Sequence, residues 1–163
     1  MAQPKKTRRP VQVLVFLARR KSEGWEFLLM RRVPRRGGFW QGVSGGAEDA
    51  EGLVEAARRE VFEETGFVLK TIEAIGYSYT FPMEAEWKHL YAPDVSRIEE
   101  HVFVALIDGR EPRLSDEHDK WRWVRLETAL ELLKWPENKE ALRRCYDFVL
   151  RYLPSAAQND DHA

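Results

Sequence analysis

The pattern of apolar and polar positions predicts short strands separated by helices and loops. Stretches rich in apolar, β-branched and aromatic residues predict strands. These are residues 11–18, 25–31, 69–81, 98–107 and 120–125. Other stretches predict helices, at residues 50–66, 126–134 and 139–153, with Asn138 as the expected N-cap of the last. Only residues 21–24 separate the first two strands, so these two strands are predicted to form a hairpin.

The connection at residues 82–97 differs from the other loops in length and composition. It reads PMEAEWKHLYAPDVSR, which is polar and rich in aromatic residues. Long loops without helices or strands of their own often bind ligands. Trp87, Lys88, His89 and Tyr91 could offer a stacking surface and charge to a bicyclic base. In the strand before this loop, Gly76 predicts a bulge or bend.

The helix predicted at residues 50–66 carries a crowded group of carboxylates. Each residue of an α-helix turns the chain by about 100°, so Glu60 and Glu64 lie one above the other with Glu63 beside them. Like charges at this spacing repel unless a cation lies among them. The alternative is a solvated helix face on which Arg59 and Glu63 form a surface ion pair.

The apolar side of the same helix predicts how it packs. Val54, Ala57 and Val61 fall on a stripe next to the carboxylates and should contact the core. Ala56 falls on the carboxylate side, where a bulky group would obstruct a metal. Gly66 should end the helix in a left-handed conformation.

Composition sets limits on the class of protein. A chain of 163 residues with 44% hydrophobic content supports one core, so we expect one domain at 10–153 between flexible tails at 1–9 and 154–163. A net charge of −1 gives no global basic field for nucleic acid. The lone Cys145, expected to be buried, excludes an intramolecular disulfide framework and a cysteine-rich zinc site. The longest apolar run, residues 13–18, is too short to span a membrane, and we expect a cytoplasmic protein.

The spacing of fixed residues around the carboxylates resembles a known motif. The chain reads GGAEDAEGLVEAARREVFEETGF from Gly45 to Phe67. Its glycines, acidic residues and arginine stand at the spacing of the Nudix box of Nudix hydrolases. So many fixed residues at fixed gaps make this motif far more specific than a short glycine pattern. The resemblance implies an α/β fold, the Nudix α/β/α sandwich with a mixed sheet.

The resemblance also implies a metal site. Carried over from the family, Glu60 and Glu64 are metal ligands, Glu63 often joins them, and Arg59 braces the glutamates. The turn at Gly45 can bring backbone groups close to the metal. Carboxylate oxygens are hard ligands that suit Mg²⁺, with Mn²⁺ as a second possibility.

Further stretches resemble the dihydroneopterin triphosphate pyrophosphatases within the family. They include FWQGVSG at residues 39–45 and the sequence around Tyr91 and Arg97. The resemblance implies substrate-binding roles for Trp40, Tyr91 and Arg97, and for Arg31, whose guanidinium matches phosphate oxygens. Other interpretations stay open: Trp40 as a core aromatic, Tyr91 packed against its neighbouring proline, and Arg31 as part of a solvated basic loop.

Residues 116–118, Asp-Glu-His, suggest a candidate for the general base. Many Nudix enzymes bring a glutamate from a loop here towards the catalytic water, which implies that role for Glu117. Glu117-His118 followed by Trp123 also resembles the neopterin enzymes. The alternative is an ordinary surface turn.

The resemblance implies metal-assisted hydrolysis of a pyrophosphate linkage. The expected substrate is a small molecule, a nucleoside or pterin triphosphate such as dihydroneopterin triphosphate or dATP, cleaved to a monophosphate and pyrophosphate. Alternatives are a dinucleoside polyphosphate or RNA 5′-end hydrolase and a non-catalytic nucleotide-sensing module. Against RNA, the chain lacks a basic stripe and has Val43-Ser44 where the RNA pyrophosphohydrolases resemble Pro-Gln.

Overall fold

One long strand, β1 (Val11–Lys21), organises the sheet of the computed structural model, which describes residues 7–108 and 110–153. The first half of β1 pairs antiparallel with β4 (Val43–Gly46), and its second half pairs antiparallel with β2 (Gly24–Arg32). On its other side, β1 pairs parallel with β6 (Arg97–Leu106). The sheet is therefore mixed, and β2 and β4 occupy different lengths of the same edge of β1.

The remaining strands extend the sheet in both directions. Beyond its contact with β1, β2 pairs antiparallel with β3 (Trp40–Gln41) and with β7 (His118–Arg125). At the opposite edge, β5 (Glu73–Pro82) pairs antiparallel with β6. The register of the β5–β6 pair shifts between Ala74 and Ser78, and Gly76 has a φ of 72°. The register shift confirms the predicted bulge or bend. Glycine suits this position because a φ of 72° is strained for residues with a side chain.

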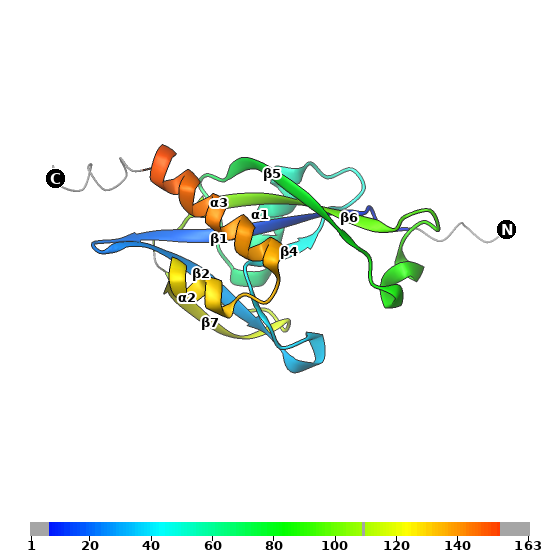
Figure 1. The fold of residues 1–163 in the computed structure, drawn as a ribbon, viewed down its shortest axis with the longest axis horizontal. Helices are drawn as coiled ribbons and strands as arrows, with labels where there is room; N and C mark the ends of the chain where they lie inside the picture. The colour runs from blue at the N-terminus through cyan, green and yellow to red at the C-terminus, as the bar shows by residue number, and fades with distance from the viewer. Residues whose placement is uncertain (1–6, 109, 154–163) are drawn as a thin grey trace.

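Helices cover both faces of this sheet (Figure 1). α1 (Leu53–Thr65) packs on one face, whereas α2 (Leu126–Leu132) and α3 (Pro136–Tyr152) pack on the other. Side chains alternate along β1, so Leu14 lies in the core beneath α2 and α3 and Val15 lies in the core beneath α1. This is the α/β/α sandwich that the family resemblance implied. Cys145 is buried in the α3 core, as predicted, and burial raises the pKa of its thiol.

The phase of α1 differs from the prediction. The helix begins at Leu53 after Gly52 rather than at residue 50, and Gly66 ends it with a φ of 79°, as expected. Val54 was placed on the apolar stripe but is 44% exposed. Ala56, placed on the carboxylate side, packs in the core with Ala57. The small side chains of Ala56 and Ala57 let α1 lie close to the sheet. With both alanines facing the core, Val54 lies on the solvent side of the helix.

Other element boundaries also need correction. β5 begins at Glu73, not at residue 69, and Leu69 packs instead in the core beneath α1. α3 begins at Pro136 with Trp135 as its N-cap, so Asn138 is not the N-cap. Proline suits the first helical turn because its φ is fixed near the helical value and a backbone donor is not required there.

The long connection after β5 has structure of its own. A 3₁₀ helix, η2 (Ala85–Leu90), occupies the middle of the predicted loop. On either side of it, Met83 and Tyr91 pack with Ile98 in a small buried cluster. The expectation of a long loop without secondary structure was therefore wrong, because this local apolar cluster gives the segment a core of its own.

The predicted tails fall largely outside the described residues. This applies to residues 1–6 and 154–163, and Gly109 also lies outside them. Residues Arg8 and Arg9 contact the domain: the Arg8 amide donates to the Leu90 carbonyl, and the Arg9 guanidinium donates to the Glu51 carbonyl. Within residues 7–108 and 110–153, no helix combines the length and apolar character needed to cross a membrane.

Candidate metal centre and active site

The turn between β4 and α1 brings a glycine against a glutamate of the helix. A β-carbon added to Gly45 would lie 2.1 Å from the Glu60 carboxyl carbon and 2.2 and 2.4 Å from its oxygens. Any side chain at residue 45 would therefore displace that carboxylate. Gly45 is required here for space, since its φ lies outside the left-handed region.

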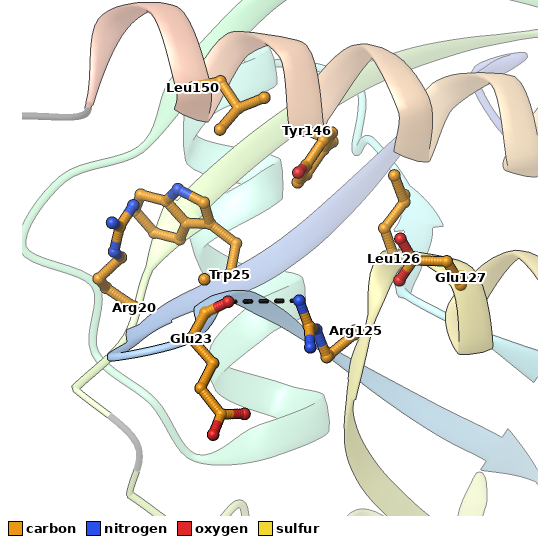
Figure 2. A pocket seen from close by; sticks show the side chains of 9 residues that line it. Arg20, Glu23, Trp25, Arg125, Leu126, Glu127, Tyr146 and Leu150 are labelled. Atoms are coloured by element: carbon orange, nitrogen blue, oxygen red, sulfur yellow. Dashed lines mark hydrogen bonds between the residues drawn. The ribbon is translucent and has the colours of Figure 1, made fainter.

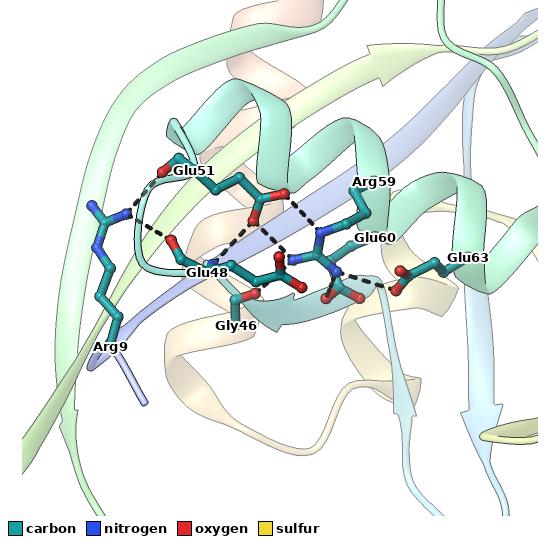
Figure 3. Close-up of polar contacts among 7 residues, drawn as sticks. All are labelled: Arg9, Gly46, Glu48, Glu51, Arg59, Glu60 and Glu63. Atoms are coloured by element: carbon teal, nitrogen blue, oxygen red, sulfur yellow. Dashed lines mark hydrogen bonds and ion pairs between the residues drawn. The ribbon is translucent and has the colours of Figure 1, made fainter. Parts of the chain in front are cut away.

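Arg59 connects the beginning of this segment to the helix (Figure 3). Its Nε and Nη2 atoms donate to the two carboxylate oxygens of Glu51 at 2.7 and 3.0 Å. Its Nη1 donates to Glu60 at 2.9 Å and to Glu63 at 3.2 Å, and Nη2 also donates to the Gly46 carbonyl at 2.9 Å. The hydrogen bonds from Arg59 lower the pKa of Glu51. A single guanidinium thus orients three carboxylates, which is the bracing geometry expected for Arg59.

Glu64 has a different environment from Glu63 on the same helix. The Glu63 side chain is 54% exposed at the rim of the site, whereas Glu64 is only 2% exposed. Among the described residues, neither carboxylate oxygen of Glu64 has a hydrogen-bond partner. Burial, and after it the neighbouring Glu60 carboxylate, raises the pKa of Glu64 well above its usual value. Burial also raises the pKa of Glu60, against the opposing charge of Arg59.

Glu117, in the loop before β7, and His118, the first residue of β7, complete this polar region. Ligand atoms of Glu64, Glu117 and His118 all lie within 4.8 Å of one another. Glu117 forms an ion pair with Arg36 at 3.2 Å. His118 is buried, and its pKa is lowered to about 4 by burial and by the nearby positive charges of Arg32 and Arg36. The loop before β7 thus reaches α1, as the hypothesis for Glu117 requires.

These residues fit a divalent cation of the Mg²⁺ or Mn²⁺ kind. A buried carboxylate without partners costs several kcal/mol of free energy unless a cation or a proton compensates its charge. Oxygen ligands suit these hard cations. Glu60 and Glu64 would hold the ion beside the Gly45 backbone, with Glu63 at the rim.

The four proposed substrate residues fall into two groups. Trp40 and Arg31 are register partners on β3 and β2, so they lie side by side. Trp40 is half-buried and packs on the core beneath α2 and α3. Arg31 forms two hydrogen bonds of 2.9 Å with the Asp119 carboxylate, and its guanidinium lies at the exposed surface.

Tyr91 and Arg97 lie apart from that pair, at the end of the sheet formed by β5 and β6. Tyr91 is only 8% exposed and packs with Met83 and Ile98, so its ring is largely buried in this cluster. Arg97 donates to the side chain and carbonyl of Thr80 across the strands. The structure does not bring these two residues together with Arg31 and Trp40.

Sequence reasoning assigned no role to Gln41 or to His118 by itself. The two side chains meet in the buried space beside Glu64, with 3.4 Å between Gln41 Nε2 and His118 Nε2. Gln41 follows Trp40 in the quoted motif, and His118 follows Glu117. Their positions next to predicted site residues were the only sequence feature that could have indicated a role for them.

A separate surface hollow lies beside the β1–β2 turn (Figure 2). It is lined by the turn, by the beginning of α2 and by Tyr146 and Leu150 of α3. Within it, Arg125 donates to the Glu23 carbonyl at 3.3 Å. The hollow adjoins the end of β1, whereas Gly45 pairs with Val13 near its beginning, so it is not part of the carboxylate site.

The fold and site define a class: an α/β/α domain whose helix α1 carries a cluster of carboxylates beside a glycine turn. The NUDIX domain model matches residues 8–145, and the chain belongs to the family of Nudix hydrolases. The expected family and fold are thereby confirmed.

Individual relatives support the same assignment. A dihydroneopterin triphosphate diphosphatase of Escherichia coli K12 is 29% identical over 146 residues, which cover 84% of this chain and 92% of that protein. The solved structure of the E. coli dihydroneopterin triphosphate pyrophosphohydrolase aligns with a TM-score of 0.74 and 28% identity, over 87% of this chain and 98% of that one. An octanoyltransferase of Myxococcus xanthus is 36% identical over 118 residues, 72% of this chain, but the match spans only 31% of that protein.

Proposed function

We propose that this Nudix hydrolase is a Mg²⁺- or Mn²⁺-dependent enzyme that cleaves a nucleoside or pterin triphosphate to a monophosphate and pyrophosphate. The observation that carries the proposal is the buried Glu64 carboxylate, which accepts no hydrogen bond from the described residues and lies on the same helix face as Glu60. A charge in this position is costly in a domain that binds no cation.

A divalent cation held by Glu60 and Glu64 would neutralise phosphate charge and activate the attacking water. The protein supplies the geometry. Arg59 fixes Glu60 and Glu63 through its hydrogen bonds, and Gly45 leaves the space that Glu60 occupies. Ligands held in place before substrate binds need no reorganisation during the reaction.

Glu117 is the proposed general base. Its carboxylate takes a proton from the attacking water, the water oxygen bonds to phosphorus, and the bond to the pyrophosphate leaving group breaks. Arg36, at 3.2 Å, keeps the Glu117 carboxylate beside Glu64 and His118. A carboxylate within reach of a water is a competent base for this step.

The Arg31–Trp40 pair and the relatives support the substrate class. Arg31 and Trp40 lie side by side, so a guanidinium for phosphate is adjacent to an aromatic ring. Stacking on aromatic rings tolerates different flat bases. The relative of similar length that acts on dihydroneopterin triphosphate supports a pterin triphosphate as the preferred substrate, with purine triphosphates such as dATP as further substrates.

A substrate panel tests the proposal. Dihydroneopterin triphosphate, dATP, diadenosine tetraphosphate and a 5′-triphosphorylated RNA are incubated with Mg²⁺, with Mn²⁺ and with EDTA, and products are separated by anion-exchange chromatography. We expect pyrophosphate from the first two substrates and only when a metal is present. Release of single phosphate would refute the proposed cleavage to pyrophosphate. A strong preference for the tetraphosphate or the RNA would refute the substrate assignment. No turnover of any substrate would favour the nucleotide-sensing alternative.

A further inference from the structure

His118 lies close to the buried Glu64 carboxylate on α1, just beyond hydrogen-bond distance. It is the first residue of β7, opposite Arg32 on β2, and its side chain is 0% exposed. Its Nε2 atom is 3.7 Å from Glu64 Oε1 and 3.4 Å from Gln41 Nε2. Its Nδ1 atom is buried and has no hydrogen-bond partner within the described part of the chain. Glu64 and Gln41 thus both approach the imidazole from its Nε2 side.

The neutral His118 imidazole carries one proton, on either Nδ1 or Nε2. A neutral histidine has one N–H donor and one acceptor nitrogen. If Nδ1 carried the proton, a buried donor would have no acceptor, and Nε2 would present a lone pair to the Glu64 carboxylate. If Nε2 carries it, the donor lies on the side of Glu64 Oε1 and Gln41, and only an acceptor nitrogen lacks a partner. An orphaned buried donor is the rarer and costlier case, so the second arrangement is favoured.

Gln41 is compatible with this arrangement. Rotating its amide by half a turn exchanges the positions of Oε1 and Nε2. The rotated amide fits the same space because the two atoms are nearly equal in size. The amide oxygen then faces the His118 N–H at about the same 3.4 Å. Gln41 and Glu64 together would define the plane of the imidazole and the direction of its donor.

We propose that His118 is a positioning residue that carries its proton on Nε2 and donates it towards Glu64 Oε1, which leaves the second Glu64 oxygen oriented for a divalent cation. The inference rests on the cation site of the proposed function. A neutral donor suits this role because it orients the carboxylate and leaves its negative charge for the metal. Hydrogen bonds to metal ligands of this kind typically change metal affinity by about 10–100-fold.

The tautomer can be read from the unmodified protein. Long-range ¹H–¹⁵N correlation spectra of uniformly ¹⁵N-labelled protein distinguish a protonated Nε2 from a protonated Nδ1 for each histidine. Assignment to residue 118 comes from the spectrum of His118→Gln. We expect the Nε2–H pattern, and the Nδ1–H pattern would overturn the proposal.

A set of variants tests the effect on the cation without relying on turnover. Glutamine can place an N–H near the Nε2 position, asparagine places one near Nδ1, and leucine has no donor. Mn²⁺ binding is measured by the loss of the free-ion signal in electron paramagnetic resonance, and folding is checked by circular dichroism. We expect His118→Leu and His118→Asn to weaken Mn²⁺ binding about 10-fold or more, and His118→Gln to stay within about 3-fold of the natural protein.

The outcomes separate this inference from the proposed function. Equal Mn²⁺ affinity in all variants, or equal weakening by Gln and Leu, would overturn the role of the Nε2 donor even if the enzyme hydrolyses triphosphates. The expected pattern in a protein that hydrolyses none of the panel would support the inference and refute the proposed reaction. If His118→Leu does not fold, the tautomer spectrum of the natural protein still decides.

Discussion

The backbone of Gly45 lies against the Glu60 carboxylate with no room for a β-carbon between them. We predict that Gly45→Ala displaces Glu60 and lowers kcat/KM by about 10²-fold or more, because an oriented charge at the site is lost. The matched control is Gly46→Ala, since a β-carbon at Gly46 meets nothing within 4 Å. Steady-state kinetics of the two variants checks the prediction. Equal activity of both would show that the position of Glu60 does not matter to the reaction.

Glu64 and Glu63 should respond differently to the same substitution. Glu64→Gln removes a buried charge, so in EDTA we expect the variant to melt higher than the natural protein, by the equivalent of about 1–3 kcal/mol. Both Glu64→Gln and Glu63→Gln should lose most turnover, by about 10²-fold, but the exposed Glu63 should leave the melting temperature unchanged.

Melting curves with and without Mn²⁺ complete this test. A bound ion stabilises only the folded state, so Mn²⁺ should raise the melting temperature of the natural protein and not that of Glu64→Gln. A Glu64→Gln variant that melts lower in EDTA would contradict the interpretation that this carboxylate is uncompensated in the protein without metal.

The agreement between sequence and structure is best where a motif lies within one helix. Glu60, Glu63 and Glu64 have their spacing fixed by the helical repeat, so their proximity follows from the sequence alone. The contact of Gln41 with His118 depends instead on the register of β3 and β7 against β2, which shifts between Arg31 and Arg32. No local pattern encodes the register of strands so distant in sequence.

The errors in the predicted helix phase and loop have similar origins. Alanine is compatible with a core or an exposed position, so Ala56 and Val54 were assigned to the wrong sides of α1. The burial of Tyr91 depends on contacts with Ile98 on the next strand. Both features depend on tertiary packing rather than on local propensity.

Arg31 and Asp119 should have opposite effects on substrate affinity. Their bidentate ion pair lies at the surface, and a substrate phosphate would compete with the Asp119 carboxylate for the same guanidinium. We predict that Arg31→Ala raises KM about 10-fold, whereas Asp119→Asn leaves KM unchanged or lowers it. Initial-rate kinetics on dATP tests both variants. A similar rise of KM in both would mean that the pair acts as a structural unit.

Glu117 should affect the chemical step rather than binding. Glu117→Gln is expected to lower kcat by about 10²–10⁴-fold and to change KM little, because a general base acts in the transition state. Raising the pH should partly restore its rate, since hydroxide needs no protein base. Asp116→Asn, at the exposed neighbouring position, is the control. A normal rate for Glu117→Gln at every pH would show that Glu117 is not the base and would support the alternative of an ordinary surface turn.

Glu100 lies in a buried polar cluster on the α3 side of the sheet, away from the Nudix helix. It is 5% exposed and accepts a hydrogen bond from the Tyr79 hydroxyl, which in turn accepts one from Asn138 Nδ2 at 2.9 Å. Burial raises the pKa of Glu100 from 4.5 to about 7, the Tyr79 hydrogen bond opposes this rise, and the charge of Glu137 on α3 adds to it.

This raised pKa predicts the direction in which stability changes with pH. The folded state holds the Glu100 proton more tightly than the unfolded chain, so the contribution is fully present below pH 4.5 and is lost as the pH rises to about 7. The free energy of unfolding falls by about 3 kcal/mol over this pH range and is constant above about pH 7 as far as Glu100 is concerned. Glu100→Gln keeps a neutral, hydrogen-bonding side chain and should abolish this part of the decline, so the variant should be the more stable protein at pH 8. Urea unfolding between pH 4.5 and 8 measures the effect, with Glu131→Gln on the exposed face of α2 as the control. Parallel stability profiles for Glu100→Gln and the natural protein would show that Glu100 titrates alike in the folded and unfolded states.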